Sequence, residues 1–178
     1  MGRHNESELT MKILSLDLAT NTGWALYDNG TITFGSSNFA LKRGESPGMR
    51  FLRCRSWLRE VLKLTGVLDL IVYEQPHQRG GHPTQVAMGL VAEVLSFAAR
   101  ANIETSSYHS TSIKKWATGK GNSKKEAMIK EAKNRGYEVT NDDEADAILM
   151  MEYALSDLHV SRGDTTRSTT KSKLVVRR

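Results

Sequence analysis

The sequence predicts an α/β domain in which a mixed five-stranded sheet is flanked by helices. Three observations predict this fold class: short apolar strands alternate with amphipathic helical segments, a tight hairpin opens the chain, and a central strand is almost continuously apolar. The length of 178 residues suits one domain with a hydrophobic core of its own.

The expected strands are 12–17, 22–28, 31–35, 68–74 and 103–109. The first three form a meander, because Asp28-Asn29-Gly30 is a strong signal for a tight turn between the second and third. The strand LDLIVYE at 68–74 is apolar at nearly every position, which is typical of a central strand covered on both faces.

The expected helices are 48–64, 84–101, 111–117, 123–136 and 143–157. The first carries an apolar stripe at helical spacing, formed by Phe51, Cys54, Leu58, Val61 and Leu62. Because the helices alternate with the later strands as crossover connections, they are expected to flank the sheet.

We expect three segments: an extension at 1–11, a domain at 12–158 and a tail at 159–178, of which the tail is distinguished by its charge. The tail holds six basic residues and one acid, so the net charge of +5 lies there and the rest of the chain is neutral. The tail is rich in Ser and Thr, which predicts a disordered basic arm that contacts a polyanion, most often nucleic acid. The alternative is a terminus that only improves solubility.

Several classes of protein are excluded. No apolar run approaches the roughly 20 residues of a membrane-spanning helix. The first eleven residues have no apolar core of a secretory signal. Cys54 has no second cysteine to pair with, and no Cys/His set has zinc spacing, so we expect a reducing, cytoplasmic setting.

Two carboxylates close buried strands. Asp17 ends the first strand and Glu74 ends the central one. A carboxylate in that position is costly unless it is paired or bound to a metal. Because α/β sheets place their sites at the carboxyl ends of strands, we expect the two to face each other.

Further acids lie in the segment NDDEADAILM. Asp146 is three residues from Asp143 and four from Asp142, so either pair shares a helix face. Asn141 or Asp142 is expected to cap this helix, and acids in the first turn favour its dipole, which explains Asp142, Asp143 and Glu144 without any site. Asp146 precedes an apolar run, and a half-buried acid there requires a cation.

These acids together suit a site for two Mg²⁺ ions that hydrolyses phosphoesters. Several carboxylates are needed to hold two divalent cations roughly 4 Å apart. Ligation by oxygen alone selects Mg²⁺ over zinc, and Mn²⁺ is the expected substitute.

Basic residues cluster in a glycine-containing segment, where we expect contacts to nucleic-acid phosphates. They are Lys114, Lys115, Lys120, Lys124 and Lys125. The alternative for each lysine is a solvated helix face. His77 and Arg79 follow Glu74 closely and are expected in a loop at the rim of the site, where they would also contact DNA.

Four segments in order resemble the RuvC family of Holliday-junction resolvases, with the bacteriophage-type members the most similar in appearance. They are SLDLATNTGWALY, IVYEQP, YHSTSIKKWATGKGNSKKEAMIK and DDEADAILM. The resemblance implies an RNase H-like fold, a homodimer, and symmetric Mg²⁺-dependent nicking of four-way DNA junctions. It also implies the host cytoplasm, if the protein is encoded by a phage.

The resemblance also implies roles for individual residues. Asp17, Glu74, Asp143 and Asp146 correspond to the family's catalytic carboxylates. Lys114 and Lys125 correspond to its functional lysines, which contact phosphate near the scissile bond. The chain departs from the bacterial pattern at Leu18-Ala19, where that pattern has Pro-Gly, and at His77, which stands where bacterial members carry an aromatic wedge. The second departure favours a wider range of branched DNA.

The sequence therefore predicts a metal-dependent, structure-selective endonuclease acting in DNA recombination and repair or in phage DNA processing. Three alternatives stay open. The first is an RNase H-like enzyme acting on RNA or on rRNA precursors. The second is an actin-like small-molecule kinase, which normally needs two such domains. The third is a junction-binding protein without activity.

Overall fold

The computed structural model describes residues 11–76, 81–158 and 170–171. A mixed sheet forms its middle layer, with the strand order β5-β4-β1-β2-β3-β6. Neighbours β1, β2 and β3 are antiparallel, whereas β4 and β5 run parallel to β1, which confirms the predicted mixed five-stranded sheet. The strands are β1 (Lys12–Asp17), β2 (Asn21–Asp28), β3 (Thr31–Asn38), β4 (Leu70–Glu74), β5 (Glu104–Tyr108) and β6 (Thr170–Lys171).

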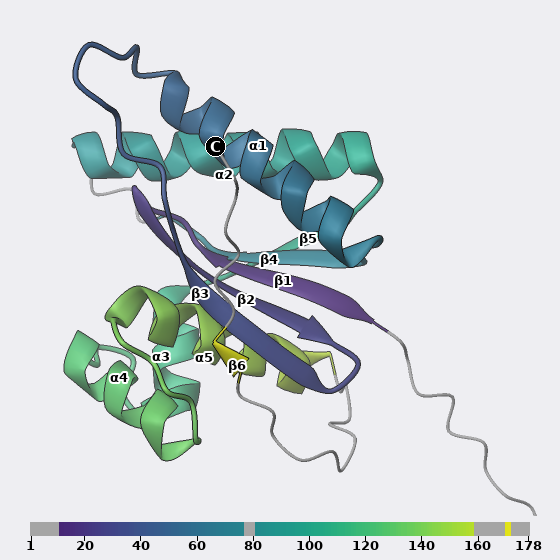
Figure 1. Cartoon of the computed structure of the whole chain (residues 1–178). Helices are drawn as coiled ribbons and strands as arrows, with labels where there is room; N and C mark the ends of the chain where they lie inside the picture. The colour runs from purple at the N-terminus through teal and green to yellow at the C-terminus, as the bar shows by residue number, and fades with distance from the viewer. Residues whose placement is uncertain (1–10, 77–80, 159–169, 172–178) are drawn as a thin grey trace, which may run out of the picture.

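Helices cover both faces of the sheet, as Figure 1 shows. One face carries α1 (Met49–Thr65) and α2 (His82–Ala101). The other carries α3 (Ser110–Thr118), α4 (Lys125–Asn134) and α5 (Asp142–Asp157). Among the described helices, none is long and apolar enough to cross a bilayer.

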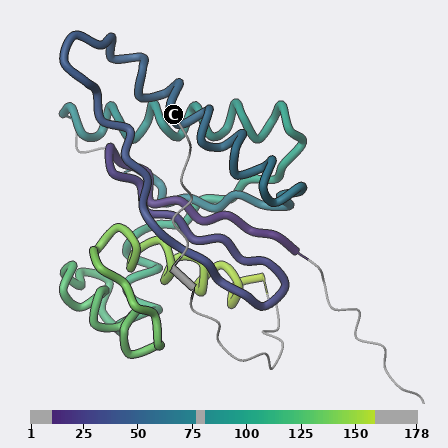
Figure 2. The backbone as a smooth tube through the Cα atoms, viewed as in Figure 1, coloured from purple at the N-terminus to yellow at the C-terminus, as the bar shows by residue number. Residues whose placement is uncertain are grey.

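The hairpin between β2 and β3 forms where the sequence predicts it, and Figure 2 shows it as one continuous bend of the backbone. Asn29 and Gly30 both have positive φ, 46° and 89°. This backbone conformation suits the right-handed twist of the two strands, and Asn-Gly is the pair that adopts it most readily.

Alternating side chains of β1 supply two separate cores. Ile13 packs towards α5, whereas Leu14 and Leu16 pack towards α1 and α2, and all three are fully buried. Ser15 also points towards α5, where its Oγ donates a hydrogen bond of 2.7 Å to the carbonyl oxygen of Ala147. This buried bond fixes the position of α5 along β1.

The strand β6 is an addition to the predicted sheet. Its two residues pair in parallel with β3, with Thr170 opposite Thr33. These two residues belong to the arm expected at 159–178, and the disorder of that arm stays a prediction. A two-residue strand has no periodicity that a sequence pattern could reveal. The remainder of that arm, like residues 1–10 of the extension expected at 1–11, lies outside the described residues.

Gly23 of β2 permits the close approach of α5, and its replacement should be severely destabilising. A Cβ at Gly23 would lie 1.9 Å from the carbonyl oxygen of Asp143, a contact that backbone atoms cannot relieve locally. We expect Gly23→Ala to lower the free energy of unfolding by about 3 kcal/mol or more, because the overpacked helix must shift.

Urea unfolding followed by circular dichroism measures this effect. Gly48→Ala is the matched control, because its nearest heavy atom would be 3.8 Å away and its φ of −66° suits alanine. We expect the control to change stability by less than about 1 kcal/mol. Equal stabilities of the two variants would contradict the contact between β2 and α5.

Candidate active site

Asp17 and Glu74 lie side by side at one edge of the sheet. In the parallel ladder of β1 and β4, Leu16 is opposite Tyr73, and each strand ends one residue later. The two carboxylates therefore occupy the carboxyl ends of neighbouring strands. Functional sites in sheets of this kind lie at that edge.

The beginning of α5 lies against the same edge. Gly23, which pairs with Asp17 across β1 and β2, is in contact with the backbone of Asp143. One turn further along α5, the carbonyl oxygen of Ala147 accepts the hydrogen bond from the Ser15 hydroxyl. Asp143 and Asp146 are thus brought to the end of β1, although they follow it by more than 120 residues in the sequence.

The start of α5 is fixed by its own side chains. Asn141 is the N-cap, and its Oδ1 accepts a 2.8 Å hydrogen bond from the backbone N–H of Glu144. The Glu144 carboxylate in turn accepts from the backbone N–H of Thr140 at 2.8 Å. Of the two expected caps, Asn141 and Asp142, the structure therefore uses Asn141, and the capping gives the buried Glu144 a structural role.

The electrostatics show that the carboxylates form one cluster. Burial, followed by repulsion from Asp146, Glu74 and the acids of the first turn of α5, raises the pKa of Asp17 well above its ordinary value. Burial and repulsion from Glu74 raise the pKa of Asp146 to about 7, against an opposing effect of Lys114. Like charges in a desolvated place account for both shifts.

The two acids that could accompany Asp146 have different partners. Asp142 forms an ion pair with Lys125, which lowers the pKa of Asp142. Asp143 instead accepts a hydrogen bond from the side-chain amide of Asn21, the first residue of β2. These contacts favour Asp143 as the acid that faces the sheet.

Asn21 is a residue of this site that the sequence analysis does not single out. The available signal is its position: it begins the strand that pairs antiparallel with β1, so it lies at the edge where β1 ends. An amide donor to a carboxylate fixes the orientation of that carboxylate, as is common for groups that bind metals.

The lysines predicted to contact DNA lie on α3, α4 and the turn between them. Lys114 is half-buried and lies close enough to Asp146 to oppose the rise in the pKa of that residue. Lys125 is exposed and is held at the cluster by Asp142. Lys115, Lys120 and Lys124 are exposed as well. His77 and Arg79 lie outside the described residues.

The donor chemistry of the cluster fits a hard divalent cation. Asp146 Oδ1 is buried and has no hydrogen-bond partner in the described part of the chain. The candidate ligands are all carboxylate oxygens, which suit Mg²⁺ or Mn²⁺. Within residues 11–76, 81–158 and 170–171, no three His, Cys, Asp or Glu side chains already have the arrangement of a metal site. In the described residues the cluster is therefore a set of neighbouring carboxylates without a completed coordination shell.

The fold of this chain matches that of solved structures. No family model matches the chain, and no curated protein matches it in sequence. Among solved structures, T. thermophilus RuvC in complex with a Holliday junction substrate superposes with a TM-score of 0.67 at 16% identity, covering 84% of this chain and 97% of that chain. The chain has the RNase H-like fold of RuvC.

A second structure of Thermus thermophilus RuvC superposes with a TM-score of 0.62 at 17% identity, over 84% of this chain and 98% of that chain. Both alignments span nearly the whole of RuvC. The predicted RNase H-like fold is confirmed, whereas the resemblance to bacteriophage-type members stays a prediction.

Proposed function

We propose that this protein is a Mg²⁺-dependent endonuclease that nicks branched DNA, with four-way junctions as its main substrate. The observation that carries the proposal is the carboxylate cluster at the end of β1, in which the buried Oδ1 of Asp146 has no hydrogen-bond partner among the described residues. The RuvC fold supports it, because the structural neighbour was solved in complex with a Holliday junction substrate.

Asp17, Glu74, Asp143 and Asp146 would hold two Mg²⁺ ions. When bound, these ions supply Lewis-acid stabilisation of the phosphate and an activated water. The protein positions the ligands: Asn21 orients Asp143, the bond between Ser15 and Ala147 fixes α5, and Gly23 lets the helix come close. Burial keeps bulk water from screening the site.

The lysines would act on the nucleic acid. Lys114 and Lys125 lie near Asp146 and would neutralise negative charge that develops on the cleaved phosphate. Lys115, Lys120 and Lys124 would contact phosphates further along the strand, which contributes affinity without reading sequence. Symmetric nicking requires two active sites, so we propose that a homodimer acts on each junction.

A cleavage panel tests the proposal. Labelled immobile four-way junction, replication fork, linear duplex and RNA duplex are incubated with the protein, with Mg²⁺ or with EDTA. We expect paired nicks in opposite arms of the junction with Mg²⁺ and none with EDTA. Preferential cleavage of the RNA duplex would favour the RNA-processing alternative. Binding of the junction without cleavage in Mg²⁺ or Mn²⁺ would leave a junction-binding protein.

A further inference from the structure

Arg50, in the first turn of α1, is a largely buried cation that pairs with no carboxylate of the described residues. It is 8% exposed. Two other arginines of the same helix are paired: Arg53 with Glu45 and Arg55 with Glu93. In the described part of the chain, Arg50 makes one hydrogen bond, of 3.2 Å, from Nη1 to the hydroxyl oxygen of Thr20.

The guanidinium of Arg50 has donors left for an anion. It carries five N–H donors, and the hydroxyl of Thr20 accepts one of them. Among the described residues, no nitrogen of Arg50 is both fully buried and without a partner, so the group still reaches the surface, where a phosphate matches its fork geometry. The first turn of α1 contains no acid, and Gly48 provides no side-chain cap, so the positive end of the helix dipole adds to the same field.

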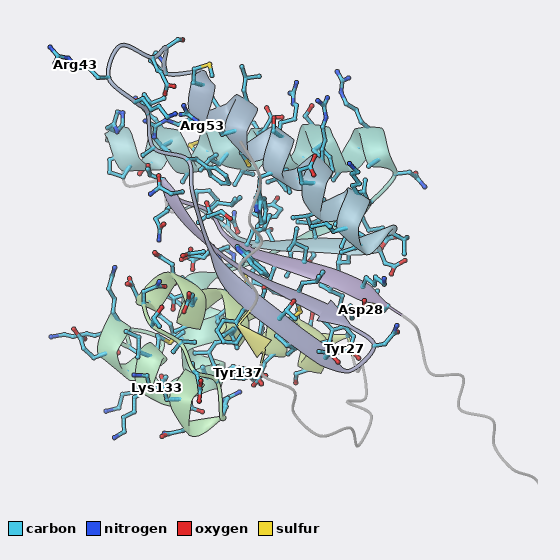
Figure 3. All side chains as sticks on the ribbon, in the orientation of Figure 1. Tyr27, Asp28, Arg43, Arg53, Lys133 and Tyr137 are labelled. Atoms are coloured by element: carbon cyan, nitrogen blue, oxygen red, sulfur yellow. The ribbon has the colours of Figure 1, made fainter. Side chains whose placement is uncertain are left out.

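Arg50 is connected to the carboxylate cluster through the turn between β1 and β2. Its partner Thr20 belongs to the three-residue connection that follows Asp17. The next residue, Asn21, donates its amide hydrogen bond to Asp143. Figure 3 shows that Arg53, which lies one turn along α1 from Arg50, is well separated from Asp28 at the β2–β3 hairpin.

We propose that Arg50, held by Thr20, binds a backbone phosphate of the nucleic-acid strand beside the phosphate that is cleaved. The inference rests on the proposed function and adds a phosphodiester-binding site on the α1 side of the carboxylates, opposite the lysines of α3 and α4. Strand phosphates are then held from both layers of helices. A guanidinium fork fixes the orientation of a phosphate more strictly than an ammonium does.

Salt-dependent binding distinguishes this site from a purely structural link between α1 and Thr20. Binding of a labelled four-way junction is measured by fluorescence anisotropy at several salt concentrations, in an Asp146→Asn background without cleavage. We expect Arg50→Gln to weaken binding about tenfold and to reduce the slope of log K against log[salt] by about 0.9, the value of one phosphate contact.

Two variants serve as controls. Thr20→Val removes the hydroxyl but keeps the cation, so the salt slope should stay unchanged. Arg53→Gln removes a cation that Glu45 already neutralises, and the slope should again stay unchanged. An unchanged slope in Arg50→Gln, or an equal fall of the slope in Thr20→Val, would overturn the proposal.

Arg50→Lys covers the case in which Arg50→Gln does not fold. It keeps the charge but loses the fork, so we expect the slope to be retained and the affinity to fall roughly threefold to tenfold. Unchanged affinity in this variant would overturn the proposal. If the unaltered protein neither binds nor cleaves the junction, the proposed function fails. If the Asp146→Asn parent binds the junction with a salt slope that does not depend on Arg50, the inference about Arg50 fails alone.

Discussion

Asp146→Asn should abolish cleavage of a four-way junction and leave junction binding intact. The expected loss of rate is about 10³-fold or more, because a neutral amide cannot balance the charge of the two cations. Asp146 is the residue to change, because its buried oxygen is unpaired in the described structure and its neighbours are other acids. The substitution also removes a repulsive charge, so the fold should not suffer.

The measurement is single-turnover cleavage of labelled junction, with anisotropy as the binding control. Asp28→Asn is the matched variant, since Asp28 lies at the β2–β3 hairpin, where it pairs with Lys12 at 3.2 Å. We expect normal cleavage from the Asp28 variant. Normal cleavage by the Asp146 variant would remove Asp146 from the mechanism, and loss of binding would show that it serves the interface instead.

The general fold follows from the sequence because its signals are local. Apolar runs fix the strands β1 and β4, the Asn29-Gly30 pair fixes the hairpin, and both reappear in the structure. The same locality places Asp17 and Glu74 at the ends of their strands. Two acids that each end a parallel strand must share an edge, so this half of the site could be predicted without coordinates.

The placement of the acids of α5 at the site depends on packing that no short segment specifies. Successive residues on a helix differ by about 100° in direction, so which of Asp142 and Asp143 faces the sheet depends on how α5 is rotated on β2. That rotation is set by the contact with Gly23 and by the buried bond from Ser15 to Ala147. Both are long-range in sequence.

The burial of Arg50 and the contact of Asn21 with Asp143 cannot be predicted from the sequence, for related reasons. A basic residue in a segment rich in arginine is ordinarily solvated, and nothing in the sequence separates the buried Arg50 from the paired Arg53. Asn21 gains its meaning only from Asp143, which lies far away in the sequence. Interactions between distant polar residues leave no periodic pattern.

In the absence of Mg²⁺, the protein should lose stability as the pH rises from about 4 to about 7, and Asp146→Asn should remove much of this loss. The pKa of Asp146 in the folded state is about 7, above its ordinary value of 3.8, and the pKa of Asp17 is raised as well. The neutral carboxyl therefore favours the fold fully below about pH 4, and this stabilisation disappears as the pH passes 7.

Thermal and urea unfolding between pH 5 and pH 8, with EDTA, measure this effect. At pH 8 we expect Asp146→Asn to be more stable than the unaltered protein by on the order of 2 kcal/mol, with a much smaller gain at pH 5. Asp28→Asn should show no such gain at either pH. A pH-independent difference between the Asp146 variant and the unaltered protein would contradict the carboxylate cluster.

Added Mg²⁺ should stabilise the folded protein by binding to the carboxylates that are proposed to hold it. A cation that binds only the folded state raises stability by mass action, so about 10 mM Mg²⁺ at pH 8 should raise the melting temperature of the unaltered protein by several degrees. Asp146→Asn should respond weakly, because it has lost both a ligand and the repulsion that the cation relieves. The residues that make cleavage possible are then the ones that make the metal-free protein unstable, which is the expected cost of holding buried acids together without a counter-charge. Equal Mg²⁺ responses in the two proteins would place cation binding elsewhere on the chain.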